Sequence, residues 1–343
     1  MSVLYITDEG TYLTRQGDQL VVMKRGNVIQ AVPGHKLNQV VVFGNAQVSS
    51  GARTWLLDAG IETIFLTMGG KLRGRTIPDE GRNIDVRRHQ FRQLDTESTA
   101  IDLARRFVEG KLVNCRTLLQ RHQRARPNTA VEMALHRLRH ASAKVQEAST
   151  LDMVRGFEGA GAAAYFGVFN HLVLVEGFPF GGRTRRPPLD ALNAMLSFGY
   201  TLLLGTVRAA VQIVGLDPYL GSLHAPENNK PAMVLDLMEE FRPLLVDAVV
   251  LRAVNRRQIT PDEFAYGVET DHETDAPKPP LAVLLGRDTM KKWILLYEDL
   301  LRQTIVHRAT GLQLTWRDVV LEQTRAVARH LKGEAPYEAF TIR

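Results

Sequence analysis

Short runs of β-branched and other apolar residues, separated by turn residues, fill the first 75 positions of the chain. Runs of this kind bounded by glycine, asparagine or aspartate are typical of β-strands. The pattern predicts strands at residues 3–6, 12–14, 20–24, 28–31, 40–43, 63–66 and 71–75. Gly26-Asn27 and Gly69-Gly70 are predicted to form hairpin turns. We therefore expect a small β-rich domain over residues 1–76.

One short helix is predicted to interrupt these strands. Ser49 or Ser50 is suited to cap its N-terminus, since a short hydroxyl side chain accepts a hydrogen bond from the first helical turn. Trp55 and Leu56 supply its apolar side, and Gly60 follows as a residue that ends a helix in the left-handed conformation.

The hydrophobic period becomes helical from about Val86 onward, after a polar and turn-rich stretch at 77–85 that we interpret as a linker. One apolar stripe steps by three or four residues and comprises Ile101, Ala104, Val108, Leu112, Cys115 and Leu119. Further helices are predicted at 129–148, 156–175, 189–214, 230–242, 289–304 and 315–331. The fold class expected is α+β, with the β-rich domain followed by a larger all-α domain over residues 86–343.

The composition is that of a globular protein. Of the 343 residues 45% are hydrophobic and 23% are charged, which excludes wholesale disorder. The single cysteine, Cys115, excludes a disulfide framework and a cysteine zinc cluster. The first residues lack the pattern of an export signal, and the uncharged run 191–207 contains too many polar residues for a membrane span. We expect a cytoplasmic protein with no membrane partner and a buried helix at 191–207.

The positive charge is concentrated in one segment. Residues 86–150 hold 13 basic and 6 acidic side chains, whereas the net charge of the whole chain is +6. The basic residues of this segment form three clusters: Arg87, Arg88 and Arg92; Arg116, Arg121, Arg124 and Arg126; Arg137, Arg139 and Lys144. Either a polyanion partner or a solvated helical face explains such a segment. A second basic cluster at Arg183, Arg185 and Arg186, on a predicted loop, favours nucleic acid.

Two single residues are candidates for chemistry. Glu158 shares a helical stripe with Ala162 and Tyr165, so its carboxylate is expected to be at least partly buried, where it needs a counter-charge or a metal. The alternative is a glutamate in a first helical turn, favoured by the helix dipole. His224 lies on a proline-bounded loop, where it is either functional or simply a polar surface residue.

A third candidate is an acidic helix with Asp236, Glu239 and Glu240 at helical spacing. Their repulsion is compensated by Arg242, by solvent or by a divalent cation. Oxygen ligands with a single imidazole favour Mg²⁺ or Mn²⁺ over zinc. The acidic stretch 269–280, which contains His272, imitates a metal cluster, but a loop offers such ligands no rigid support.

Several of these segments together resemble the CRISPR-associated integrase, the universal adaptation nuclease of CRISPR systems. The matching segments, in order and spacing, are EGKLVN at 109–114, FEG at 157–159, YF at 165–166, RRPPLDALNAMLSFGY at 185–200, GSLH at 221–224 and DLMEEFRP at 236–243. With the N-terminal strands, the resemblance covers nearly the whole chain.

The resemblance implies a β-rich N-terminal domain and an α-helical catalytic domain, a homodimer, and assembly with a small partner nuclease of the same adaptation module. It implies a metal site for Mg²⁺ or Mn²⁺ made of Glu158, His224 and Glu239. Asp236 matches a further catalytic acidic position, either a direct ligand or a support for another ligand. The implied reaction joins the 3′-hydroxyl of a short double-stranded DNA fragment to a phosphodiester at the border of a CRISPR repeat, which inserts a new spacer.

Other polar residues are assigned around this site. We expect five side chains to lie near the cation and to help hold the phosphate or the ligands: Arg186, Asn193, Ser197, Tyr200 and Arg242. Arg121 and Arg124 are expected to contribute sequence-independent affinity for DNA. Two other functions remain open. One is a structure-selective nuclease of branched DNA, and the other is a DNA-binding scaffold without catalysis, in which the acidic helix is only a solvated face.

Overall fold

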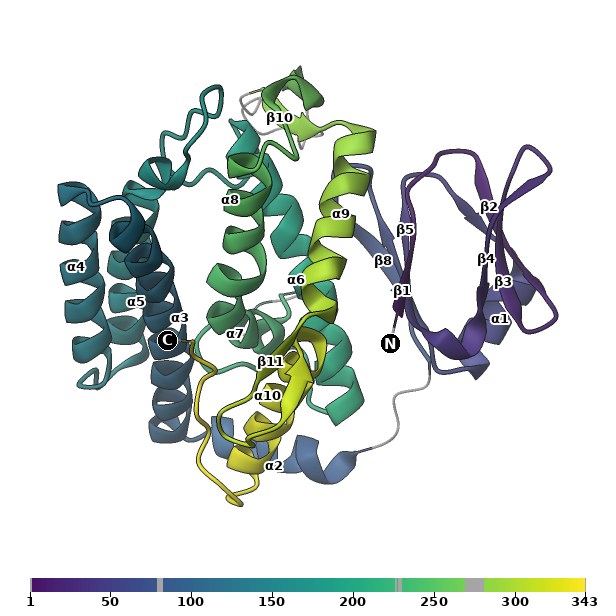
Figure 1. The fold of residues 1–343 in the computed structure, drawn as a ribbon. Helices are drawn as coiled ribbons and strands as arrows, with labels where there is room; N and C mark the ends of the chain where they lie inside the picture. Colours follow the sequence, from purple (N-terminus) through teal and green to yellow (C-terminus); the bar gives the residue numbers. More distant parts are fainter. Residues whose placement is uncertain (1, 79–82, 226, 228–229, 269–280, 343) are drawn as a thin grey trace, which may run out of the picture. The chain divides into compact units, whose positions relative to one another are not determined.

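A computed structural model describes residues 2–78, 83–225, 227, 230–268 and 281–342 (Figure 1). The chain divides into two compact units, Met1–Arg82 and Asn83–Arg343. Strands dominate the first unit and helices the second, so the α+β class expected from the sequence is confirmed.

The first unit contains two four-stranded sheets. In one sheet β1 (Ser2–Ile6), β5 (Leu37–Phe43) and β7 (Glu62–Leu66) run parallel, and β8 (Leu72–Thr76) pairs antiparallel with β7. The other sheet has the order β4 (Asn27–Pro33), β3 (Gln19–Lys24), β2 (Thr11–Gln16) and β6 (Gln47–Val48). All the predicted strands are present. The two-residue strand β6 was not predicted, because it is too short to show a period.

The core of this unit unites both sheets with helix α1 (Ser50–Asp58). As predicted, the Ser49 side chain caps α1 by accepting a hydrogen bond from the Ala52 amide, and Gly60 follows with a positive φ of 73°. The predicted turn at Gly26-Asn27 is displaced by one residue. Lys24 pairs with Asn27, so Arg25 and Gly26 form the turn, with φ of 50° and 83°.

The second unit is a bundle of helices with two small hairpins. The helices of its described part are α2 (Ile84–Leu94), α3 (Glu97–Ala125), α4 (Thr129–Val145), α5 (Leu151–Gly167), α6 (Ala191–Val214), α7 (Ala232–Phe241), α8 (Ala248–Asn255), α9 (Arg287–Arg302) and α10 (Trp316–Leu331). The hairpins are β9 (Phe264–Val268) with β10 (Ala282–Leu285), and β11 (Thr304–Val306) with β12 (Gln313–Thr315). Helix α3 packs against α4, α5 and α7, and α6 packs against α7 and α10 (Figure 1).

Helix α6 matches the expectation of a buried helix. It is long and apolar enough to cross a membrane by length and composition, but 67% of its most apolar window is buried inside the fold. Its N-cap is Asp190, whose side chain accepts a hydrogen bond from the Asn193 amide, and Gly215 ends it with φ of 88°. It is therefore placed as a core helix of this unit.

Three predicted boundaries are wrong. Helix α5 begins at Leu151 rather than at 156, because the Thr150 side chain caps it at the Met153 amide. Helix α2 begins at Ile84, inside the stretch interpreted as a linker. Pro243 does not end the acidic helix, because α7 runs on through a π-helical turn, Arg242–Asp247, into α8. The wider π turn relieves the clash that a proline ring makes in an α-helix.

Candidate active site

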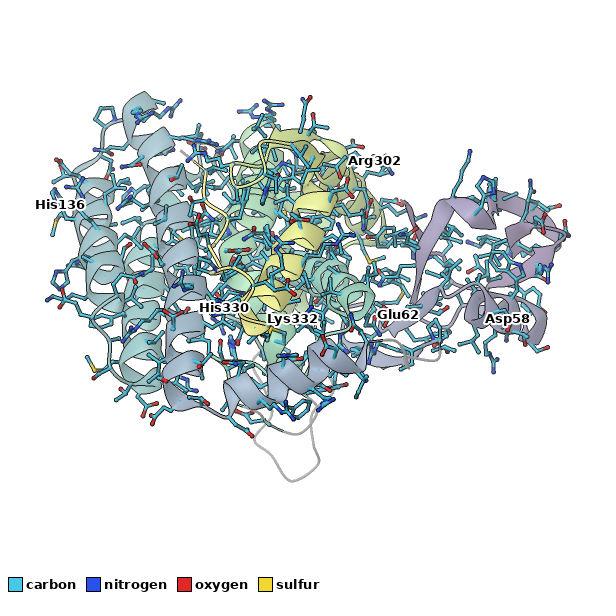
Figure 2. All side chains as sticks on the ribbon, turned by 90° about the horizontal axis from the view of Figure 1, so that it is seen from below. Asp58, Glu62, His136, Arg302, His330 and Lys332 are labelled. Atoms are coloured by element: carbon cyan, nitrogen blue, oxygen red, sulfur yellow. The ribbon has the colours of Figure 1, made fainter. Side chains whose placement is uncertain are left out.

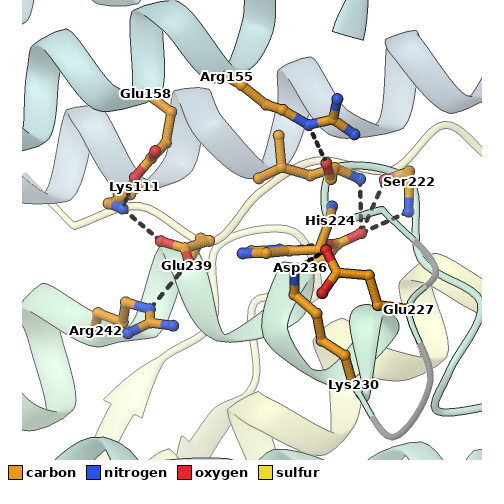
Figure 3. A network of polar contacts seen from close by, with 11 residues as sticks. Lys111, Arg155, Glu158, Ser222, His224, Glu227, Lys230, Asp236, Glu239 and Arg242 are labelled. Carbon is orange, nitrogen blue, oxygen red and sulfur yellow. Dashed lines mark hydrogen bonds and ion pairs between the residues drawn. The ribbon is translucent and has the colours of Figure 1, made fainter. Parts of the chain in front are cut away.

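Three helices and one loop bring together Lys111, Glu158, His224 and Glu239 (Figure 3). Lys111 comes from α3, Glu158 from α5, Glu239 from α7, and His224 from the loop before α7. The ammonium group of Lys111 makes an ion pair with Oε1 of Glu158 and lies 2.6 Å from Oε2 of Glu239. Since α3 packs directly on α5 and α7, rigid elements hold the site.

The three charged groups are largely buried. The side chains of Lys111, Glu158 and Glu239 are 8%, 25% and 5% exposed. Burial alone lowers the pKa of Lys111, but the carboxylates of Glu239 and Glu158 outweigh it and raise that pKa above its usual value. Burial alone raises the pKa of Glu239, but the charges of Arg242 and Lys111 hold it well below its usual value. Lys111 and Glu239 are therefore both charged at neutral pH.

The position of Glu158 decides between its two interpretations. Because α5 begins at Leu151, Glu158 lies in the third turn of the helix and not in the first. The favourable end of the helix dipole therefore does not explain this carboxylate. Its counter-charge is Lys111, which reaches it from α3.

The donor atoms suit a divalent cation that prefers oxygen. Glu239 Oε2 is buried, and the Lys111 ammonium 2.6 Å away meets its charge. Two carboxylates beside an imidazole are donors that Mg²⁺ and Mn²⁺ accept. In the described ranges no three histidine, cysteine, aspartate or glutamate side chains are gathered into a metal cluster. Lys111 stands between the two carboxylates instead.

Asp236 orients His224 and does not face the Lys111 cluster. Its Oδ1 accepts hydrogen bonds from the backbone amide and from Nδ1 of His224, the latter at 2.7 Å. Its Oδ2 accepts hydrogen bonds from the amides of Ser222 and Leu223 and from the Ser222 hydroxyl. The His224 ring then projects from Asp236 towards Glu239, so Nε2 is the nitrogen left for a ligand (Figure 3).

The three acidic residues of α7 do not form one cluster. Asp236 binds the 222–224 loop, Glu239 binds Lys111 and Arg242, and Glu240 accepts hydrogen bonds from Gln323 and from the Phe340 amide. Burial raises the pKa of Glu240 to about 8. All three residues are buried, at 0%, 4% and 0% exposure, so the interpretation of α7 as a solvated acidic face is wrong.

Two arginines, Arg242 and Arg183, stack on the Tyr200 ring close to Glu239. Nε of Arg242 lies 3.1 Å from Oε1 of Glu239, and the Arg242 guanidinium lies 4.7 Å from the ring centre of Tyr200. The Arg183 guanidinium lies 5.4 Å from the same ring centre. Stacking on an aromatic ring holds a guanidinium without neutralising it, so Arg183 keeps its charge for an anion, whereas Arg242 shares its charge with Glu239.

Asp247 fixes the Tyr200 ring from the end of the π-helical turn. Its two carboxylate oxygens accept hydrogen bonds from the hydroxyls of Tyr200, at 2.7 Å, and Tyr165, at 3.0 Å. Burial raises the pKa of Asp247 to about 6, although the two tyrosine hydroxyls oppose this rise. Tyr165 is buried and also carries this polar contact.

Lys111, Arg183, Arg185, Arg242 and Asp247 line one pocket, together with Tyr200 and a set of mostly apolar side chains. The apolar set comprises Cys115, Ala162, Tyr165, Phe166 and Pro243. With four cations against one carboxylate, the lining of this pocket is positively charged, which favours an anion over a cation.

Three of the five residues expected near the cation do not line the pocket. Asn193 Oδ1 and Ser197 Oγ both accept hydrogen bonds from the Arg183 guanidinium, so these side chains orient Arg183. Arg186 is exposed and does not line the pocket, whereas Arg183 and Arg185 of the same cluster do. Of the five residues, Tyr200 and Arg242 are the two that line it.

The basic segment presents part of its charge at the surface. Arg121 and Arg124 are exposed near the C-terminal end of α3, about 15–20 Å along the helix from Lys111. Arg137 and Arg139 are exposed on α4, whose outer side also carries His136 (Figure 2). Arg105 instead donates to the Ala148 carbonyl, so not every arginine here is available to a partner.

Lys111 and Asp247 were not singled out by the sequence pattern. Lys111 lies three residues after Val108 and four before Cys115, on the buried side of α3. A lysine on a buried stripe requires a counter-charge, and this signal was available in the sequence. The acidic stretch containing His272 lies outside the described residues.

Comparison with known proteins identifies the family. The family model "CRISPR associated protein Cas1" matches residues 4–299. The chain belongs to the Cas1 family. It is 33% identical over 346 residues to "CRISPR-associated endonuclease Cas1 3" of Thermus thermophilus, covering 100% of this chain and 98% of that protein.

A longer Cas1 relative and a solved structure extend the comparison. The chain is 34% identical to a "CRISPR-associated exonuclease Cas4/endonuclease Cas1 fusion" of Geobacter sulfurreducens, with 99% of this chain covering 60% of the fusion. Its fold is similar to that of "Casposase bound to integration product", with a TM-score of 0.83, 22% identity, and coverage of 99% of this chain and 93% of that one.

Proposed function

We propose that this chain is a metal-dependent DNA integrase of CRISPR adaptation. The 3′-hydroxyl of a short DNA duplex attacks a phosphodiester at the border of a CRISPR repeat, so that a new phosphodiester forms while the old P–O bond breaks and releases a 3′-hydroxyl on the repeat strand. Membership of the Cas1 family supports this, as does the similarity of its fold to a protein described as bound to an integration product. The observation that carries the proposal is the pair of carboxylates, Glu158 and Glu239, which both pair with the Lys111 ammonium and lie beside His224.

Glu158, Glu239 and Nε2 of His224 would hold Mg²⁺ or Mn²⁺. When bound, the ion neutralises charge on the attacked phosphate and lowers the pKa of the entering hydroxyl. Asp236 keeps the His224 ring in position through Nδ1. Arg183 and Arg242 orient the anionic strand from the pocket beside the carboxylates. The exchange of one phosphodiester for another requires no nucleotide cofactor.

The proposed assembly is a homodimer that works with a small partner nuclease of the adaptation module on double-stranded DNA. The exposed arginines Arg121 and Arg124 would contact phosphates without reading the sequence. Specificity for the repeat is then expected to come from other surfaces or from the partner.

The test is a joining assay with a labelled duplex, Mn²⁺ or Mg²⁺, and a plasmid that carries repeats. A strand-joined product is expected with a 3′-hydroxyl end, and none with a matched 3′-dideoxy end, which has no nucleophile. Glu239→Ala and His224→Ala should abolish joining and leave duplex affinity nearly unchanged, while the matched variant Glu147→Gln at an exposed site should join normally. Full joining by Glu239→Ala would refute the assignment.

A second candidate is a nuclease that cuts branched DNA. The endonuclease names of the curated relatives favour it, and water in place of the 3′-hydroxyl would make the same site hydrolytic. Cut product from both the 3′-hydroxyl and the 3′-dideoxy duplex, without joined product, would support this candidate. The scaffold alternative is disfavoured, because the acidic side chains of α7 are buried rather than solvated.

A further inference from the structure

Lys111 occupies the place between the two carboxylates that a divalent cation would need. Its ammonium contacts Glu158 and Glu239 at the same time, and its side chain is 8% exposed. An ammonium and a divalent cation that share these oxygens would lie within a few ångströms of each other in a poorly solvated place, where like charges repel strongly. The two cations therefore exclude each other.

Lys111 has a second place available. It lines the basic pocket together with Arg183, Arg185 and Arg242, so its four-carbon stem stands at the boundary between the carboxylates and the pocket. Arg242 is in the same situation, because it pairs with Glu239 on one side and stacks on Tyr200 on the other. The one carboxylate lining the pocket, Asp247, is already bonded to two tyrosine hydroxyls.

We propose that Lys111 is an exchangeable cation: it holds Glu158 and Glu239 in the metal-free protein, leaves them when a divalent cation binds, and then binds a phosphate oxygen of the DNA strand from the basic pocket. This inference rests on the proposed metal-dependent function. It assigns to Lys111 two successive partners, first carboxylates and then a phosphate.

The exchange predicts an unusual pair of effects for one substitution. In Lys111→Met the carboxylates are always accessible to Mn²⁺. In wild type they are accessible only in the fraction of molecules in which Lys111 has left them, and the apparent Mn²⁺ affinity is reduced by that fraction. We expect at least about a tenfold tighter Mn²⁺ affinity, since two ion pairs keep that fraction small. Joining should at the same time become roughly a hundredfold slower, because the phosphate loses a charged donor.

The experiment measures Mn²⁺ binding to the full chain by electron paramagnetic resonance, without DNA, and joining separately. Lys111→Met is compared with wild type and with Lys292→Met, a matched change at a lysine that pairs with Glu263 elsewhere. Lys292→Met should bind Mn²⁺ as wild type does. Lys111→Gln, a neutral hydrogen-bond donor, serves where Lys111→Met folds poorly, and Mn²⁺ should raise the Tm of either Lys111 variant more than that of wild type.

Each outcome tests a different part of the proposal. Unchanged or weaker Mn²⁺ affinity in both Lys111 variants overturns the exchange while leaving the proposed metal site in place. Tighter Mn²⁺ affinity with unchanged joining overturns the phosphate role. If neither wild type nor the Lys111 variants bind Mn²⁺, the proposed function and the exchange are both contradicted.

Discussion

Nδ1 of His224 lies 2.7 Å from Oδ1 of Asp236, and Asp236 is completely buried. The same carboxylate binds the amides of Ser222, Leu223 and His224, so it fixes both the loop and the ring. A carboxylate in this place selects the tautomer in which Nδ1 carries the proton and Nε2 keeps its lone pair. The sequence left open whether Asp236 is a ligand or a support, and its contacts favour the support.

Asp236→Asn tests this support. The amide keeps the shape of the side chain, but it is a weaker acceptor for the Nδ1–H group and brings N–H groups against amides of the loop. We expect affinity for Mn²⁺ to fall by roughly 10- to 100-fold, with joining reduced at subsaturating Mn²⁺. Titration of Mn²⁺ by electron paramagnetic resonance measures this, with Asp299→Asn as an exposed control. Unchanged affinity would show that His224 needs no help from Asp236.

Arg121 and Arg124 provide a test of the path of the DNA. Replacing both by glutamine removes two exposed positive charges from the end of α3. If both contact phosphates, the slope of log affinity against log salt should become less steep by about 1 to 2. Fluorescence anisotropy of a labelled duplex at several salt concentrations measures the slope, with Arg302→Gln as a control on α9. An identical slope in the double variant would place the DNA elsewhere.

The sequence predicted helices and strands well where the hydrophobic period extends over many residues or where turn residues mark the ends of an element. The apolar stripe on α3 is buried from Ile101 to Leu119, as its spacing requires. Pro243 was misleading because a proline normally ends a helix, whereas here a π-helical turn accommodates it. Such a turn depends on tertiary packing, and no local pattern encodes it.

The sequence named some of the residues that the structure brings together and missed others. Glu158, His224 and Glu239 were assigned to one site through the family resemblance, but the partner that Glu158 and Glu239 share is Lys111, which lies 47 positions from Glu158 and 128 from Glu239. Contacts over such separations follow from the packing of α3 against α5 and α7. The anion pocket also depends on Asp247, which reaches Tyr165 and Tyr200 from another element.

Gly199 and Gly156 form a matched pair for testing the packing of the bundle. A Cβ atom on Gly199 in α6 would lie 2.6 Å from the Trp293 ring and 2.6 Å from a methyl carbon of Val246, whereas a Cβ on Gly156 in α5 would meet nothing within 4 Å. Gly199→Ala should therefore lower the free energy of unfolding by about 1–3 kcal/mol. Gly156→Ala should raise it by up to about 1 kcal/mol through helix propensity. Urea denaturation measures both, and equal effects would contradict the packing of α6 on α9.

Asp247 gives the pH dependence of stability a definite sign. Its pKa is raised from 3.8 to about 6 in the folded protein, because burial disfavours the charged carboxylate more than the hydroxyls of Tyr200 and Tyr165 favour it. Between these two pH values the folded state holds a proton that the unfolded state has lost, so this group makes the free energy of unfolding fall as pH rises from about 4 to 6. The slope from one group is at most about 1.4 kcal/mol per pH unit.

Asp247→Asn isolates this contribution, since the amide does not titrate and its oxygen still accepts a hydrogen bond from Tyr200. Other titrating groups contribute to wild type and variant alike, so the difference between their free energies of unfolding should change between pH 4 and 6 and become constant above pH 7. The difference in slope carries the test, because the amide also alters the absolute stability. Urea denaturation at a series of pH values measures it. Parallel curves for the two proteins over this range would mean that Asp247 titrates as it does in the unfolded chain, and the buried carboxylate that holds the Tyr200 ring would then have to be solvated.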